Sequence, residues 1–126
     1  MIMNKEEINI SSLSDVYDNL NNALNIANSD LEKAGCIQYF EIAFELSWKI
    51  LRRILKQNGI EINNPRDVFR EAAKNNLIDD VEDWFSYIKM RNLTTHTYSH
   101  KYSTEVFATL PSFNISLKHL ITKISS

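Results

Sequence analysis

The segment from Leu31 to Asn58 constrains the fold of this chain more than any other feature. Apolar side chains recur there at every third or fourth position, the spacing that places them on one face of an α-helix. A second apolar set widens this face, so the helix either lies at the centre of a bundle or is buried on two sides in an oligomer. The first set is Ile37, Phe40, Phe44, Trp48, Leu51 and Leu55, and the second set is Ile42, Leu46, Ile50 and Ile54. The polar residues at 28–30 offer a cap at its start, and we expect Gly59 to end it, because glycine readily adopts the left-handed conformation of a C-terminal cap.

One further helix is expected before this segment and another after it. The N-terminal one begins after Ser12 or Ser14, either of which could cap it. The other is short: it begins at Pro65 behind the cap residue Asn64 and ends near Asn75. Both assignments rest on the cap residue followed by apolar side chains at helical spacing.

The C-terminal part of the chain predicts two further long helices. The first is capped by Asp79 or Asp80 and continues through residues 91–98. The second runs from Thr104 to Ile124, and we expect it to be interrupted or kinked near Pro111 because proline cannot donate the helical hydrogen bond.

The predicted fold is an all-α, antiparallel up-and-down bundle of four long helices and one short helix. Only two glycines and two prolines occur among 126 residues, too few for the frequent tight turns of an all-β protein. We find no internal repeat or linker, so residues 1–126 are expected to form one domain, with residues 1–11 loosely ordered.

A cytoplasmic location is expected. A single cysteine, Cys36, allows neither an internal disulfide nor a site of several thiolates, and this fits a reducing compartment. The first residues, MIMNKEEINI, lack the apolar stretch of a signal peptide, and no run approaches the roughly 18 apolar residues that span a bilayer.

A basic stripe on the predicted second helix is a candidate phosphate- or RNA-binding surface. The formal net charge of the chain is −2, so contact with a nucleic acid is expected from a local patch rather than from the whole surface. The stripe has the helical spacing i, i+3, i+4, i+7 and consists of Lys49, Arg52, Arg53 and Lys56. The alternative is an ordinary solvated face on which Lys49 pairs with Glu45, one helical turn earlier.

The eight residues RNLTTHTY, from Arg91 to Tyr98, gather the groups best suited to chemistry. An arginine binds phosphate through a permanently charged, planar donor fork, and a histidine exchanges protons near neutral pH. Arg91 and His96 could therefore cleave RNA without metal: the imidazole accepts the proton of the ribose 2′-hydroxyl or protonates the leaving oxygen, and the guanidinium stabilises the charged phosphorane. The alternative is a polar helix end that serves only for capping and solvation.

The expected helical geometry separates these two groups. On a regular helix, five residues correspond to about 140° of rotation and roughly 7.5 Å of rise. Convergence on one phosphate therefore needs a bend, a long reach by Arg91, or two copies of the motif that meet across a dimer. The same geometry places Asn92 on the face of His96, and Thr95 and Tyr98 on the face of Arg91.

No metal site or cofactor is expected. His100 and His119 have no accompanying pattern of carboxylates or thiolates, and His100 is either a second proton-transfer group or an exposed surface residue. Glu41 and Glu45 are one turn apart and are either a catalytic carboxylate pair or partners in salt bridges.

Four blocks in a fixed order resemble the nucleotidyltransferase substrate-binding family, a branch of the HEPN superfamily. The blocks are FEIAFELSWK (Phe40–Lys49), NPRDVFREAAKNNLIDD (Asn64–Asp80), Trp84 and RNLTTHTY at 91–98. The resemblance covers roughly Asn19 to Ile124, and the order of the blocks makes it specific, because Arg-x4-His alone arises by chance.

The resemblance implies a dimeric helical bundle that pairs with a minimal nucleotidyltransferase in a toxin–antitoxin module. By this resemblance, Arg91 and His96 serve metal-independent RNA cleavage near the dimer interface, with Asn92 as their polar neighbour. Tyr98 matches the tyrosine to which the partner attaches AMP and thereby silences the toxin. Ser99 stands where many relatives have an acidic residue or an amide, a departure that removes no named catalytic group.

Three functions remain open on the sequence alone. The chain is an endoribonuclease toxin, a non-catalytic subunit that presents a substrate or nucleotide to the nucleotidyltransferase, or a dimeric adaptor. Intact Arg91, His96 and Tyr98 favour the first over the third, but phosphate binding needs the same arginine and histidine as cleavage does.

Overall fold

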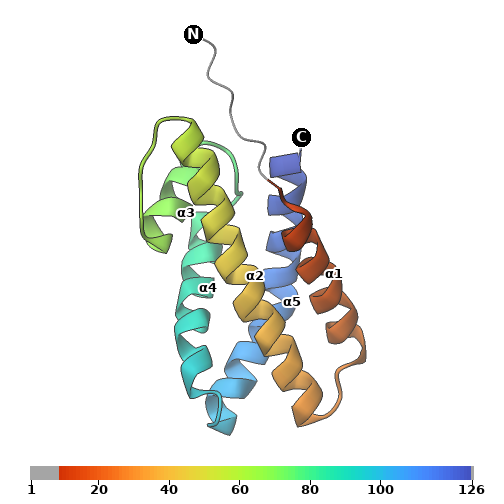
Figure 1. Ribbon diagram of the computed structural model, residues 1–126. Helices are drawn as coiled ribbons and strands as arrows, with labels where there is room; N and C mark the ends of the chain where they lie inside the picture. The colour runs from red at the N-terminus through yellow and green to blue at the C-terminus, as the bar shows by residue number, and fades with distance from the viewer. Residues whose placement is uncertain (1–8, 126) are drawn as a thin grey trace.

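The computed structural model describes residues 9–125, and the predicted all-α fold is confirmed. The elements are α1 (Ser11–Ile26), α2 (Asp30–Gln57), α3 (Pro65–Lys74), α4 (Val81–Leu93), the 3-10 helix η1 (Thr94–His96) and α5 (His100–Ser125). In Figure 1, α1, α2, α4 and α5 run alternately down and up an elongated bundle, and the short α3 lies beside α4 at one end. Of the residues predicted to be loosely ordered, 1–8 lie outside the described part, and Ser11 already belongs to α1.

Three of the four predicted N-terminal caps are confirmed. Ser29 and Glu32 form a reciprocal capping box at the start of α2, and backbone hydrogen bonds from Ser29 and Asn28 lower the pKa of the Glu32 carboxyl. Asn64 caps α3 and Asp80 caps α4 through their side-chain oxygens. The prediction for α1 was wrong: this helix starts at Ser11, behind Ile10, and the Asn9 side chain accepts a hydrogen bond from the Ser11 N–H at 2.8 Å.

α2 and α3 end in the same motif. Gly59 has a φ of 85°, its N–H donates to the Lys56 carbonyl, and the N–H of Ile60 donates to the Leu55 carbonyl. At the end of α3, Asn76 has a φ of 58°, and Leu77 donates to the Ala72 carbonyl in the same way. Both helices therefore end in a left-handed residue that satisfies their last carbonyls, as predicted for Gly59.

The predicted continuation of α4 through residues 91–98 was wrong. α4 ends at Leu93, a 3-10 turn follows, and α5 begins at His100, four residues before the predicted Thr104. Three threonine hydroxyls each donate to the backbone carbonyl three residues earlier: Thr94, Thr95 and Thr97. Such local bonds compete with the regular helical pattern and favour the tighter 3-10 turn.

Of the two expectations for Pro111, an interruption or a kink, the interruption of α5 is wrong. The helix continues from His100 to Ser125, and Pro111 lies at an exposed position between the buried Leu110 and Phe113. Burial of these neighbours against the core outweighs the hydrogen bond that proline cannot donate.

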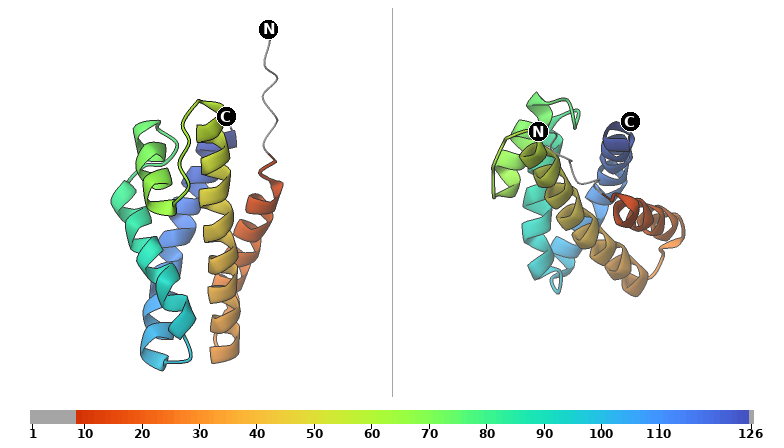
Figure 2. Two further views of the ribbon diagram at one scale, coloured as in Figure 1. Left: turned by 60° about the vertical axis from the view of Figure 1, so that its left-hand side comes forward. Right: turned by 45° about the horizontal axis from the view of Figure 1, so that its top comes forward.

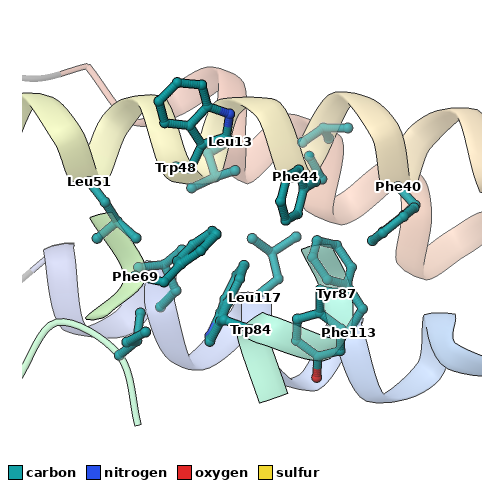
Figure 3. Close-up of a cluster of buried hydrophobic side chains, with 14 of the residues drawn as sticks. Leu13, Phe40, Phe44, Trp48, Leu51, Phe69, Trp84, Tyr87, Phe113 and Leu117 are labelled. Atoms are coloured by element: carbon teal, nitrogen blue, oxygen red, sulfur yellow. The ribbon is translucent and has the colours of Figure 1, made fainter. Parts of the chain in front are cut away.

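An aromatic cluster from four helices fills the centre of the bundle (Figure 3). Phe69 and Trp84 stack with ring centroids 4.8 Å apart, and Phe113 meets Tyr87 edge to face at 5.2 Å. The Tyr87 hydroxyl is 2.7 Å from Ser116 Oγ, and burial raises the pKa of Tyr87. Trp84 and Tyr87 are thus core residues and do not form a platform for base stacking.

α2 is the central helix, and it contacts each of the other four α-helices (Figure 2). Its wide apolar face is used inside one chain: Ile50 is buried, Leu46 and Ile54 are partly buried, and only Ile42 remains 43% exposed. The width of this face therefore gives no argument for a dimer. Cys36 is fully buried on the same helix, where burial raises the pKa of its thiol and makes it a small apolar core residue.

Candidate functional site

The structure divides the Arg-x4-His-x-Tyr segment between three local conformations. Arg91 lies in the last turn of α4, His96 ends the 3-10 helix, and Tyr98 lies in the turn before α5. In Figure 1 this connection forms one tip of the bundle. The helical faces predicted for Asn92 with His96, and for Arg91 with Thr95 and Tyr98, assumed a regular α-helix, whereas α4 ends at Leu93.

Arg91 is anchored to α2 by ionic contacts. Its Nε is 3.6 Å from Glu45 Oε1, and its Nη1 is 4.0 Å from Glu41 Oε2. Nη1 also donates to the Oγ1 of the buried Thr94 at 3.0 Å. Glu41 and Glu45 are therefore salt-bridge partners of Arg91, as in the second of the two interpretations, and not a catalytic carboxylate pair. Only 27% of the Arg91 side chain is exposed, and Nη2 takes part in none of these contacts.

Glu45 holds several groups at once. Its Oε2 accepts a hydrogen bond from Trp48 Nε1 at 3.1 Å and lies 3.8 Å from Lys49 Nζ, so the predicted Lys49 pair is confirmed. Because Arg91 Nε is buried and has no acceptor within hydrogen-bonding distance, its ionic contact with Glu45 is loose.

His96 and Tyr98 are exposed at the tip and lie against each other. The Tyr98 side chain is 87% exposed, and its hydroxyl oxygen is 3.4 Å from His96 Nδ1. The Tyr102 ring, from the first turn of α5, lies 6.2 Å from the His96 ring. The turn is closed by backbone bonds, among them Ser99 N–H to the His96 carbonyl, so the two side chains are free to meet a ligand.

Two grooves flank this tip. The first, which we call the Tyr98 groove, lies between α2 and α5, has a volume of about 470 Å³ and is bordered by Tyr98, Lys33, Glu41 and Phe107. Its border includes one of the two carboxylates that hold Arg91.

The second groove, which we call the His96 groove, is shallow and open, follows α4 with Arg66 of α3 on its border, and has a volume of about 800 Å³. It is bordered by Arg66, Phe85, Lys89, Asn92 and His96, among others. Asn92 and His96 are thus brought to one groove, although not by the helical register that the sequence suggested.

Three residues of the basic stripe on α2 lie away from the tip, whereas Lys49 pairs with Glu45, which also contacts Arg91. Arg52, Arg53 and Lys56 border a shallow hollow together with Glu61, and the Arg52 guanidinium lies 5.1 Å from the Trp48 ring centroid. This C-terminal half of α2 lies at the end of the bundle opposite to the α4–α5 turn (Figure 1). These three cations are therefore separate from the surface that presents His96 and Tyr98.

Sequence reasoning missed Arg66, Phe85 and Lys89. Phe85, Lys89 and Asn92 follow the spacing i, i+4, i+7, and this pattern could have placed them on one face of α4. Arg66 comes from α3, and only the packing of the two helices brings it to the same groove.

Within residues 9–125, no cluster of three or more potential metal ligands occurs, and no helix has the length and apolar character to cross a membrane.

The fold and the tip together define an all-helical domain that presents an Arg-x4-His-x-Tyr turn. The family described as nucleotidyltransferase substrate binding protein like matches residues 8–126. The chain therefore belongs to this family, and the predicted resemblance is confirmed.

Named relatives and solved structures agree with this assignment. A protein of Haemophilus influenzae named "Probable ribonuclease HepT" is 36% identical over 96 residues, which are 72% of this chain and 66% of that protein. A solved structure from Haemophilus influenzae, described as the fold of a substrate binding domain of a nucleotidyltransferase, superimposes with a TM-score of 0.84 at 30% identity and covers 94% of this chain and 100% of that one. A crystal structure from Thermus thermophilus has the same TM-score at 25% identity, and covers 90% of this chain and 99% of that one.

Proposed function

We propose that this protein is a HEPN-type, metal-independent endoribonuclease that pairs with a minimal nucleotidyltransferase in a cytoplasmic toxin–antitoxin module. The observation that carries the proposal is the tip of the bundle, where the exposed His96 and Tyr98 touch, together with Arg91, which lies five residues before His96 and is held against α2. The name of the Haemophilus relative as a ribonuclease supports the same chemistry.

In the proposed reaction, His96 transfers protons and Arg91 stabilises charge. An imidazole accepts the proton of the ribose 2′-hydroxyl, the 2′-oxygen bonds to phosphorus, and the bond from phosphorus to the 5′-oxygen breaks. The leaving oxygen takes up a proton, and the products end in a 2′,3′-cyclic phosphate and a 5′-hydroxyl. No metal ligand is needed, because protons and the guanidinium neutralise the charge of the phosphorane.

The two carboxylates on α2 and the Thr94 hydroxyl together hold Arg91 in place for this reaction. Glu41 and Glu45 contact Nη1 and Nε, so the remaining nitrogen, Nη2, is the one directed to a phosphate. Fixing a long side chain in advance reduces the entropy lost when the substrate binds.

A homodimer completes the proposed site. Two copies of the tip supply two imidazoles, one as the base and one as the acid, and Arg91 of one chain acts with His96 of either chain. The support for this part comes from the family resemblance and from the need for two proton-transfer groups. Light scattering at micromolar concentration is expected to give about twice the 14.7 kDa of one chain, and a clean monomer would remove the composite site.

Tyr98 is the proposed site of AMP attachment by the nucleotidyltransferase. Its hydroxyl is exposed enough to enter the active site of another enzyme and lies 3.4 Å from the imidazole that we assign to catalysis. The hydroxyl oxygen displaces pyrophosphate from the α-phosphate of ATP and loses its proton, which leaves one AMP on the ring. The added phosphate and base then occupy the space that RNA needs at His96.

A second candidate function is a non-catalytic subunit that holds a nucleotide for the nucleotidyltransferase. Two carboxylates already neutralise Arg91, which weakens its attraction for a substrate phosphate. The Tyr98 groove, at about 470 Å³, has the size of a small-molecule site, and Lys33 lies 5.4 Å from the Phe107 ring centroid within it. A phosphate and a base could be held by this pair.

Cleavage of RNA in the presence of EDTA separates the two functions. The endoribonuclease is expected to cut RNA with the chelator present and to leave 2′,3′-cyclic phosphate ends or their hydrolysis products. Activity that disappears with EDTA and returns with magnesium would contradict the mechanism. An intact protein that binds nucleotide and cleaves no RNA would establish the second function.

A further inference from the structure

We propose that the His96 groove is a binding track for single-stranded RNA. Phosphates are held by Lys89 and Arg66, an unpaired base stacks on the Arg66–Phe85 pair, and the strand passes Asn92 to reach His96. This inference rests on the proposed ribonuclease function and adds the surface that delivers its substrate.

The charges of the groove are available to a ligand. Among residues 9–125, no carboxylate lies within ion-pair distance of Arg66 or Lys89. Neighbouring cations on α3 are already paired: Arg70 with Asp67 at 2.8 Å, and Lys74 with Glu71 at 3.2 Å. A cation that binds a phosphate releases the counterions held by the RNA. An unpaired cation can do so without first losing an ion pair within the protein.

The groove also contains a surface for stacking. The Arg66 guanidinium lies 4.4 Å from the Phe85 ring centroid, and Arg66 is exposed whereas Phe85 is half-buried. Proteins that bind single-stranded RNA stack unpaired bases on aromatic rings and on guanidinium planes. Because a base in a duplex is already stacked and paired, this feature favours a single strand.

The register of α4 connects these groups to the catalytic residue. Phe85, Lys89 and Asn92 share one face over about 10 Å of helix, and the 3-10 turn places His96 at the end of the same groove. Glu82 borders the opposite end, where its charge disfavours a phosphate. The phosphates are therefore expected between Arg66 and His96, so that the strand is directed to the tip.

Binding to RNA can be measured without cleavage in a His96→Ala background. The probe is a fluorescently labelled oligouridylate, which forms no stable duplex, and its anisotropy gives Kd over a series of salt concentrations. Lys89→Gln and Arg66→Gln are expected to weaken binding several-fold, and each to reduce the magnitude of the salt slope by about 0.7. Arg66→Lys keeps the charge and loses the planar stacking surface, so it is expected to weaken binding with the slope unchanged.

The matched control is Lys74→Gln, which removes the same charge from an ion-paired lysine outside the groove. It is expected to leave Kd unchanged. Groove variants that bind like the parent, or a Lys74→Gln variant that binds as weakly as Lys89→Gln, would overturn the proposal, because binding would then follow overall charge.

Kinetics of Lys89→Gln in the otherwise native protein distinguish this inference from the proposed function. A binding track predicts a higher KM with kcat unchanged. If the native protein cleaves RNA and KM does not change in this variant, the ribonuclease function stands and the track is wrong. If the native protein cleaves no RNA, the ribonuclease function fails, and the anisotropy series alone decides whether the groove binds RNA.

Discussion

The two ends of the segment from Arg91 to Tyr98 have opposite environments. Arg91 is mostly buried, contacts two carboxylates of α2 and bonds to a buried threonine. His96 and Tyr98, only a few residues later, are exposed and touch little except each other. The structural reason is the change from α4 to a 3-10 turn, which carries the chain from the interface between helices to the tip.

Under the proposed function, this difference separates stability from catalysis within one motif. The Arg91 end joins α4 to α2, so changes there are expected to affect both the fold and any chemistry. His96 and Tyr98 are exposed, so under the proposed function changes to their side chains are expected to affect chemistry more than the fold. The following predictions test that division, from the largest expected effect to the smallest.

His96→Ala is expected to reduce RNA cleavage by at least about 100-fold, as is typical for loss of a general acid–base group. Its free energy of unfolding in urea is expected to change by no more than about 0.5 kcal/mol, because the ring is exposed. His119→Ala, near the other end of α5, serves as the control and is expected to keep full activity. Cleavage by His96→Ala at the parent rate would show that the catalytic assignment is wrong.

Tyr98→Phe is expected to abolish addition of AMP by the partner nucleotidyltransferase in the presence of ATP. The phenylalanine lacks the hydroxyl that attacks the nucleotide, and the exposed position keeps the fold intact. Intact-mass measurement checks this, with Tyr102→Phe as the control for a neighbouring tyrosine. An AMP mass that persists in Tyr98→Phe would place the modification on another residue.

Arg91→Ala is expected to lower the free energy of unfolding by about 1–2 kcal/mol. The change leaves Glu41 and Glu45 facing each other without the cation they share, and it removes a donor to Thr94. Urea denaturation checks the value, and adding Glu45→Gln to Arg91→Ala is expected to recover part of it because one unpaired charge is removed. An Arg91→Ala protein as stable as the parent would show that the α2 contacts carry no stability.

The exposed contacts of Asp79 serve as a comparison for how much the exposed His96 end contributes to stability. A hydrogen bond from Lys123, aided by one from His119, lowers the pKa of Asp79 below its ordinary value of 3.8. A carboxyl with a lower pKa in the folded state stabilises the fold above its unfolded-state pKa, and this contribution disappears as pH falls through the folded-state pKa. Asp79→Asn is therefore expected to flatten the loss of stability at acidic pH, measured as the urea midpoint. An unchanged pH profile would show that this exposed cluster, like the His96 end, adds little to stability.

The fold could be predicted from the sequence because its signals are local. The apolar periodicity of α2, the caps Ser29, Asn64 and Asp80, and the glycine at position 59 each determine conformation within a few residues. The errors arose where competing local interactions had to be weighed. Threonine hydroxyls end α4 early, and burial of Leu110 and Phe113 carries α5 past Pro111.

The candidate site could be predicted in its residues but not in its geometry. Arg91, His96 and Tyr98 stand out by chemical type and by their order along the chain. Their environments depend on contacts between elements distant in sequence, such as Glu41 with Arg91, and periodicity on one helix contains no information about these. The same limit explains why Arg66 was missed, since it reaches the groove only through the packing of α3 on α4.

The most direct test of this account measures RNA cleavage in EDTA before and after the partner enzyme has modified the protein with AMP. We expect the unmodified protein to produce 2′,3′-cyclic phosphate ends, the modified protein to lose this activity, and Tyr98→Phe to keep it after the same treatment. Cleavage that continues at the original rate after complete modification, or no cleavage by the unmodified protein, would contradict the claim that the exposed His96–Tyr98 tip is the ribonuclease site.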